Sequence, residues 1–309
     1  MQLQQLRYVV AVAQERHFTR AAAALHVSQP SVSSAVRDLE RELGAPLFHR
    51  ERGGVTVTPA GAVFLPWARQ ALADLERSRV EVRELLGLRG GTLSLGATPS
   101  LTTGLLPPVL AGFRARWPAV GLSLREAGSS DLASAVAAGT LDAALVILPA
   151  AAPGLVTTPL AVEELVLAVA VGHPLAQRRR LSLADLRGVP LVVPREGYEL
   201  RAATVAACRG AGFEPVLALE AGELDGVLAM AAAGLGAAVV PSTVLAGTIA
   251  PATLRAVRFA GGALTRTVGL ATRGDRPRSR AATAFADGLL DLLRTEGWPG
   301  APVAGLTPA

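Results

Sequence analysis

Residues 18–40, FTRAAAALHVSQPSVSSAVRDLE, contain two short helical patterns separated by a tight break. Thr19 is the expected N-cap of the first helix, and the break falls at residues 26–27. Ser28 is the expected N-cap of the second helix, with Pro30 tolerated in its first turn, where a missing N–H costs little. Four apolar residues then follow at the i, i+3, i+4, i+7 spacing of one buried stripe: Val32, Ala35, Val36 and Leu39. The pattern predicts a helix-turn-helix, with an ordinary pair of packed helices as the alternative.

The opposite face of the second helix carries short hydrogen-bonding side chains and one arginine over its first turns, with no acidic residue. Such groups reach base edges in a major groove and hold phosphates. Residues 47–50 and 55–58 then predict two strands around a turn at 51–54, which is a wing beside the helix-turn-helix; a solvated turn is the alternative. We expect the DNA contacts to come from Thr19, Arg20, Ser28, Gln29, Pro30, Ser31, Ser33, Ser34, Arg37, Arg50 and Arg52.

A long helix is predicted from Thr58-Pro59, an N-cap followed by proline at the first helical position, to Gly87. Its apolar residues alternate steps of four and three, as in a heptad seam, which favours a dimerisation helix. Pro66 is expected to kink the first two turns. The seam comprises Phe64, Ala68, Ala71, Leu75, Ser78, Val82 and Leu85.

From residue 92 onward, short apolar runs alternate with helical patterns, which predicts parallel sheets flanked by helices. Two such α/β lobes would hold a ligand between them, at the carboxyl ends of their strands. The expected strands are 92–98, 121–126, 143–147, 165–171, 191–193, 216–219, 237–240 and 268–272, and the expected helices are 101–116, 130–138, 183–186, 201–209, 224–233 and 280–293.

Polar residues follow several of these strands. Hydroxyls and free N–H groups at a helix N-terminus favour an anion or a carboxylate, so we expect an anionic small molecule there; simple helix capping is the alternative. The candidate effector-binding residues are Pro99, Ser100, Thr102, Ser129, Ser130, Arg195, Glu196 and Glu220.

Composition limits the remaining functions. All 30 basic residues are arginine, and the net charge of +5 permits nucleic-acid binding without proving it. One cysteine, Cys208, excludes an internal disulfide, and four scattered histidines have no metal-ligand spacing.

No secretory signal is evident, and glycines and prolines interrupt the uncharged stretch 226–254, so we expect no membrane span. An enzyme is disfavoured because no HExxH, P-loop or GxSxG motif occurs, and a solute-binding protein is disfavoured by the missing signal; both stay as alternatives. We expect no metal and no cofactor.

Residues 1–61 resemble the N-terminal domain of LysR-type transcriptional regulators. The matching residues include Phe18, Thr19, the Ala21-Ala22 pair, Leu25, Val27-Ser28-Gln29-Pro30, Ser33, Leu39-Glu40, Leu43-Gly44, Pro46-Leu47-Phe48, Arg50, Thr58 and Gly61. The chain departs from the pattern at Ser34 and Ala35, where many members carry longer polar or basic side chains. The second half resembles the effector domain of the same family through Gly139, Leu141-Asp142-Ala143, His173-Pro174-Leu175-Ala176 and 233–236 running to Pro241.

The resemblance implies an α/β protein with an all-α-dominated N-terminal winged helix-turn-helix, a long linker helix and a two-lobed effector domain of the type 2 periplasmic-binding-protein fold. We expect the DNA-binding domain at 1–58, the linker and dimerisation helix with its hinge at 59–91, the effector domain at 92–295 and a flexible tail at 296–309. Lobe I would comprise about 92–162 and 267–295, and lobe II about 163–266. The implied partners are double-stranded promoter or operator DNA, a small-molecule effector and further copies of the chain, as a homodimer through the linker helix and a homotetramer. The implied location is the cytoplasm.

Overall fold

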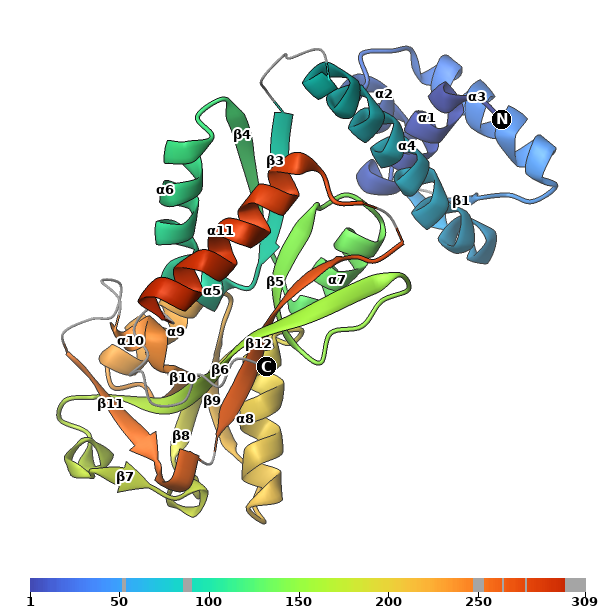
Figure 1. Cartoon of the computed structure of the whole chain (residues 1–309). Helices are drawn as coiled ribbons and strands as arrows, with labels where there is room; N and C mark the ends of the chain where they lie inside the picture. Colours follow the sequence, from blue (N-terminus) through green and yellow to red (C-terminus); the bar gives the residue numbers. More distant parts are fainter. Residues whose placement is uncertain (52–53, 86–90, 247–252, 263, 276, 298–309) are drawn as a thin grey trace. The chain divides into compact units, whose positions relative to one another are not determined.

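The computed structural model describes residues 1–51, 54–85, 91–246, 253–262, 264–275 and 277–297 (Figure 1). The chain divides into two compact units, Met1–Gly90 with Ala138–Thr140, and Gly91–Ala137 with Leu141–Ala309. Each unit is considered by itself. Among the described residues, no helix combines the length and the apolar character needed to cross a membrane.

The first unit has three helices, a hairpin and one long helix: α1 (Leu3–Glu15), α2 (Phe18–Ala24), α3 (Gln29–Leu43), β1 (Phe48–Glu51), β2 (Gly54–Val57) and α4 (Pro59–Leu85). The core lies where α1, α2 and α3 meet, and the rings of Phe18 and Phe48 pack edge to face with centroids 6.2 Å apart. β1 and β2 pair antiparallel. The Glu40 carboxylate accepts the N–H groups of Leu47 and Phe48 and so fixes the turn between α3 and β1.

The caps of these helices follow the sequence with one correction. Ser28 caps α3 by accepting the N–H of Ser31, Gly44 ends α3 in the left-handed region, and Thr58 accepts the N–H of Gly61 at the start of α4. The N-cap of α2 is His17, whose ring Nδ1 accepts the N–H of Thr19, so the prediction of Thr19 as the cap was wrong. The helix begins at Phe18, because this buried ring belongs to its inward face.

The residues of the seam predicted on α4 differ in their burial. Phe64 packs against the core of its own unit and Ala68 is buried, whereas Ala71, Ser78 and Val82 are exposed. The large apolar side chains that α4 exposes near its start are Val63 and Trp67 instead, with 69% and 67% of their surfaces accessible. The predicted membership of the seam therefore needs correction at its first two positions. The side chain of Leu85 lies outside the described residues.

The second unit begins with one α/β lobe, formed by β3 (Gly91–Ala97), α5 (Pro99–Gly104), α6 (Leu106–Arg116), β4 (Val120–Glu126), α7 (Ser129–Ala137) and β5 (Ala143–Leu148), and completed by β12 (Thr265–Arg273) and α11 (Arg280–Glu296). β3 lies between β4 and β5 and is parallel to both. α6 and α11 cover one face of the sheet, where Phe113 meets Phe285, and α7 covers the other (Figure 1). The expected single helix at 101–116 is two helices, because Pro107 and Pro108 lack the N–H groups that would continue α5 into α6.

The second lobe contains β7 (Arg180–Leu181), β8 (Pro190–Pro194), α8 (Glu199–Gly210), β9 (Val216–Ala221), α9 (Leu224–Ala232), β10 (Ala238–Pro241), α10 (Ser242–Ala246) and β11 (Leu254–Phe259), with short 3-10 turns at Pro174–Gln177, Leu183–Leu186 and Ala260–Gly262. β8 and β9 are parallel. A core of Leu, Val and Ala side chains fills the space between these strands and helices. The sequence did not predict β7 or β11 as separate elements, whereas the glycines and prolines of residues 226–254 did indicate a helix start at Pro241, immediately before α10.

One strand joins the two lobes. β6 (Leu155–Ala170) was expected only from residue 165, but it is sixteen residues long. Residues 155–164 pair with β12 in the first lobe, and residues 165–170 pair with β10 and β11 in the second. β12 returns alongside β6, with Arg266 opposite Glu163. The lobes therefore meet at two adjacent antiparallel strands.

Candidate DNA-reading and effector sites

The exposed face of α3 lies opposite Val32, Val36 and Leu39, whose side chains are fully buried. Ser31, Ser34 and Arg37 are exposed, and Gln29 is half-buried. Arg37 donates from Nε to the carbonyl oxygen of Ser33 at 3.2 Å. This bond holds the base of the guanidinium against the helix.

Other predicted DNA contacts lie at the ends of α2 and α3. Thr19 and Arg20 are exposed on α2, and Arg20 donates to the carbonyl of Glu15 at the end of α1. Ser28 and Pro30 are exposed at the start of α3, where the Ser28 and Ser31 hydroxyls are 2.7 Å apart.

One member of the predicted set does not lie on this exposed face, and two others fall partly or wholly outside the described residues. Ser33 is only 5% exposed, because it neighbours Val32 on the inward side of the helix, so its expected place on the exposed face was wrong. Arg50 is described by its backbone alone, in β1 opposite Val55. Arg52 lies outside the described residues. A short hydroxyl side chain fits either face of an amphipathic helix, which is why the sequence misplaced Ser33.

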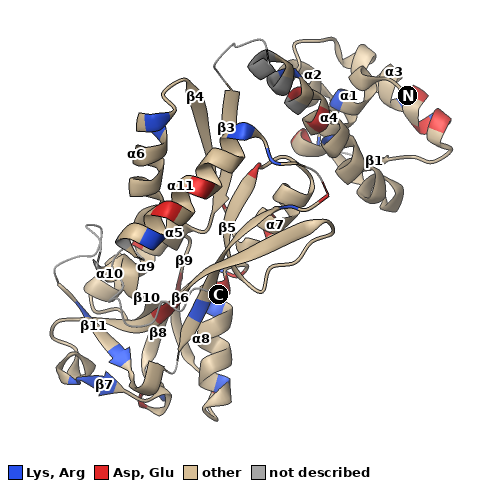
Figure 2. Ribbon diagram, in the orientation of Figure 1, with Lys and Arg blue, Asp and Glu red and all other residues tan. Residues whose placement is uncertain are grey.

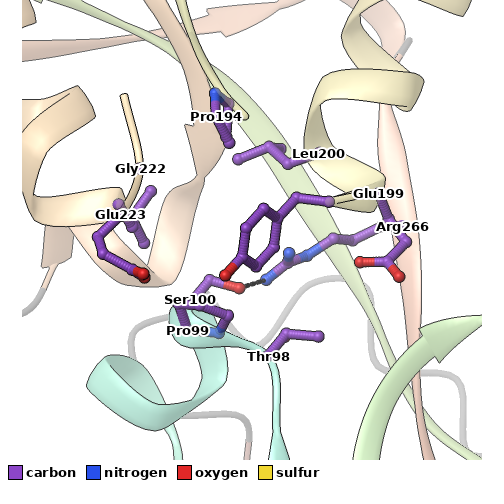
Figure 3. A pocket seen from close by; sticks show the side chains of 11 residues that line it. Thr98, Pro99, Ser100, Pro194, Glu199, Leu200, Gly222, Glu223 and Arg266 are labelled. Atoms are coloured by element: carbon purple, nitrogen blue, oxygen red, sulfur yellow. Dashed lines mark hydrogen bonds between the residues drawn. The ribbon is translucent and has the colours of Figure 1, made fainter. Parts of the chain in front are cut away.

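A cavity lies between the two lobes of the second unit. The first lobe contributes Thr98, Pro99, Ser100 and, from β12, Arg266, and the second contributes Pro194, Tyr198, Glu199, Leu200, Gly222, Glu223 and Leu224. Figure 3 shows Ser100 and Arg266 pointing toward each other at the floor of the cavity. The cavity is partly open to solvent, and the space inside it is about 30 Å³. That volume holds about two water molecules.

A buried ion pair forms the floor of this cavity. Arg266 donates to Glu163 from Nε at 2.7 Å and from Nη2 at 2.6 Å, and Nη2 also donates to the Ser100 hydroxyl at 2.9 Å. The Thr243 hydroxyl donates to the other oxygen of Glu163. The side chains of Glu163 and Arg266 are 0% and 7% exposed. A buried charge pair with this number of hydrogen bonds holds the guanidinium in one orientation.

Only two of the eight predicted effector residues, Pro99 and Ser100, line the cavity. Ser129 reaches it indirectly, because its N–H donates to Glu199. Thr102 is half-buried and Ser130 is exposed, and neither lines it.

The three remaining predicted residues lie toward α8. Glu196 lines a separate groove along that helix, where Arg201 pairs with both Glu196 and Glu220. Arg195 is exposed and stacks over Tyr198, and a hydrogen bond to the Tyr198 hydroxyl raises the pKa of Arg195. Figure 2 shows the resulting mixture of basic and acidic residues on and near α8.

The polar cavity residues that the sequence did not identify are Thr98, Tyr198, Glu199, Glu223 and Arg266, together with Glu163, which pairs with Arg266 but does not itself line the cavity. Thr98 immediately precedes the predicted Pro99, and its place in the strand-to-helix turn was a usable signal. Glu163 and Arg266 gave none, because their pairing joins positions 103 residues apart. Within the described residues, no three His, Cys, Asp or Glu side chains are grouped to hold a metal ion.

A helix-turn-helix with a wing, joined in one chain to a two-lobed domain with a polar cavity between its lobes, defines a ligand-responsive DNA-binding regulator. The family profiles agree. Residues 3–62 match the bacterial regulatory helix-turn-helix of the lysR family, and residues 86–294 match the LysR substrate binding domain. The chain belongs to the LysR family of transcriptional regulators, which are not enzymes.

Relatives and solved structures of the family match nearly the whole chain. The transcriptional dual regulator GltC of Bacillus subtilis is 32% identical over 295 residues, 95% of this chain and 98% of the relative. A probable hydrogen peroxide-inducible genes activator of Mycobacterium avium is 34% identical, covering 94% of each chain. Full-length OxyR of Pseudomonas aeruginosa is similar in structure (30% identity, TM-score 0.71, 94% of each chain), as is CbnR in complex with its target DNA (28% identity, TM-score 0.69, 94% of this chain and 99% of that one).

Proposed function

We propose that this regulator binds promoter DNA as a homodimer, and that a small anionic effector bound between the lobes changes its promoter binding or activation. The observation that carries the proposal is the polar cavity between two lobes that share the strand β6. A ligand that touches both lobes changes their relative orientation, because it binds one arrangement more tightly than the other.

The anionic character of the effector is inferred from the donors around the cavity. Arg266 offers a fixed guanidinium, Ser100 offers a hydroxyl, and the N–H of Ser129 is already paired with a carboxylate, that of Glu199. Fixed donors of this kind are suited to a carboxylate. The partners would then be promoter DNA, one small carboxylate and a second copy of the chain, and the regulator would act in the cytoplasm, where the promoter is.

Hydrogen peroxide is a second candidate signal, because relatives carry that name. In this chain the single thiol, Cys208, is fully buried, and burial raises its pKa. The thiolate is the form that reacts with oxidants. We therefore favour a bound effector over oxidation of this cysteine. Micromolar hydrogen peroxide that changed promoter binding in a manner abolished by Cys208→Ala would overturn this preference.

The DNA-binding part of the proposal is tested by a gel shift on the DNA that adjoins the gene, with wild type, Arg37→Ala and the matched control Arg116→Ala. Loss of one arginine contact costs about 1–3 kcal/mol, so the dissociation constant of Arg37→Ala should rise about tenfold, with no change for the exposed Arg116 on α6. An unchanged affinity for Arg37→Ala contradicts its role. Repeating the titration with a panel of small carboxylates and aromatic acids tests the effector.

The dimer is inferred from the exposed apolar side chains of α4. Val63, Trp67 and Val82 are 69%, 67% and 54% exposed along a helix of 27 residues. An apolar strip on so long a helix is suited to a second copy of that helix. Trp67→Glu should halve the mass measured by sedimentation equilibrium, and an unchanged mass would rule out this face. The tetramer implied by the family is a further outcome of the same measurement.

A further inference from the structure

The side chain of Glu199, the first residue of α8 in the second lobe, forms a hydrogen bond with the first lobe. Its Oε1 accepts the backbone N–H of Ser129 at 2.5 Å, and Ser129 begins α7. The Ser129 hydroxyl in turn accepts the N–H of Ile147 in β5 at 2.9 Å, so this residue is fixed to the sheet of the first lobe. The partial positive charge at the start of a helix strengthens its bond to a carboxylate.

The two backbones also meet beside this bond. A Cβ atom placed on Gly128 would overlap the carbonyl oxygen of Gly197 and would lie 3.7 Å from Oε1 of Glu199. Gly197 has a φ of +94°, a conformation that other residues rarely adopt. The lobes touch here because neither position carries a side chain.

The same cavity contains an unsatisfied polar group. Thr98 is 3% exposed and lines the cavity together with Glu199, and its hydroxyl oxygen has no hydrogen-bond partner among the described residues. Buried hydroxyls are nearly always paired, so this one indicates a position for a ligand atom. With about 30 Å³ available inside the cavity, the part of a ligand that reaches Thr98 has room for only about two water-sized groups while the lobes keep this arrangement.

We propose that Glu199 is a built-in substitute for the effector's carboxylate. Its side chain occupies the N–H of Ser129 and holds the lobes together, and a carboxylate effector takes over that N–H and the Thr98 hydroxyl. The release of Glu199 frees the start of α8 and allows the second lobe to move. This inference rests on the proposed function, because it assumes that an effector binds in this cavity.

The bond itself is tested without any effector. Hydrogen exchange of the Ser129 amide is followed by NMR in the full chain for wild type, Glu199→Ala and the matched control Glu214→Ala. This control removes an exposed glutamate just beyond the C-terminal end of α8, where it pairs with Arg209. Exchange should accelerate at least tenfold in Glu199→Ala and stay unchanged in Glu214→Ala. Equal exchange in all three proteins overturns the proposal.

Competition is tested with acetate at constant ionic strength, by titrating the chemical shift of the Ser129 amide. Glu199→Ala should bind acetate at least tenfold more tightly than wild type or Glu214→Ala, and Glu199→Gln, which keeps an acceptor and loses the charge, should fall between them. Affinities within twofold across the four proteins overturn the competition. If no carboxylate alters promoter binding in any of these proteins, the proposed function fails, whereas the exchange result stands independently.

Discussion

Removal of one partner of the Glu163–Arg266 pair should destabilise the second unit strongly. Glu163→Gln keeps the shape and a hydrogen-bond acceptor but leaves Arg266 as an uncompensated charge, at a side-chain exposure of 7%. Breaking a buried pair in this way costs about 3–5 kcal/mol. At about 2–4 °C per kcal/mol for a domain of this size, the melting temperature should fall by about 6–20 °C.

The measurement is urea unfolding of the full chain, followed by circular dichroism at several temperatures. The double variant Glu163→Leu with Arg266→Met replaces both charges with apolar groups of similar volume and should recover most of the loss, because pairs of buried charges contribute little beyond their own desolvation. A loss below about 1 kcal/mol for Glu163→Gln would refute the burial argument. If the double variant loses as much free energy of unfolding as Glu163→Leu and Arg266→Met lose together, the shape of the side chains and not their charge sets the cost.

Three further predictions concern other parts of the chain. Gly61→Ala should lower the free energy of unfolding by about 1–3 kcal/mol, because the added Cβ would overlap the carbonyl oxygen of Leu47. Gly112→Ala on α6 has open space around the added Cβ and should raise it by about 0.4–1 kcal/mol, both measured by thermal unfolding. Ser28→Ala should destabilise the first unit by about 1 kcal/mol through loss of the cap on α3, measured by the same method. Burial raises the pKa of Cys208, so the folded chain keeps the thiol proton to higher pH than the unfolded chain. The contribution of Cys208 to the free energy of unfolding is therefore constant below pH 9.0 and declines above it. Comparing the stability of wild type and Cys208→Ala at pH 7 and at pH 10 measures this decline.

The helical part of the fold could be predicted from sequence because its signals are local. Ser28, Gly44 and Thr58 each mark a helix end with a hydrogen bond or a backbone conformation that lies within three residues of the cap. The predicted strands of the first lobe coincide with β3, β4 and β5 within a residue or so, because short apolar runs in a parallel sheet are distinctive.

The site was less predictable because its contacts are distant in sequence. Ser100 could be proposed from its position after a strand, but its partner Arg266 lies 166 residues away. Glu199 belongs to the site only because α8 begins opposite α7 across the cavity. Neither position has a local sequence pattern that separates it from the exposed arginines and glutamates of the chain. The first half of β6 was missed although Pro153-Gly154 marks a turn before it, because Pro159 and the adjacent Glu163 and Glu164 interrupt its apolar pattern.

The passage of β6 through both lobes also determines the order in which the protein can be made. The sheet of the first lobe opens with residue 91 but is completed by β12 and α11, which end at residue 296, so this lobe encloses the whole of the second in the sequence. During synthesis at about 5–20 residues per second, β6 emerges about 5–20 s before its partner β12. In that interval residues 165–170 of β6 can pair with β10 and β11 in the second lobe, whereas residues 155–164 still lack their partner strand β12. Truncation between residues 270 and 290 would remove part or all of α11 and would therefore unfold the first lobe while sparing the second.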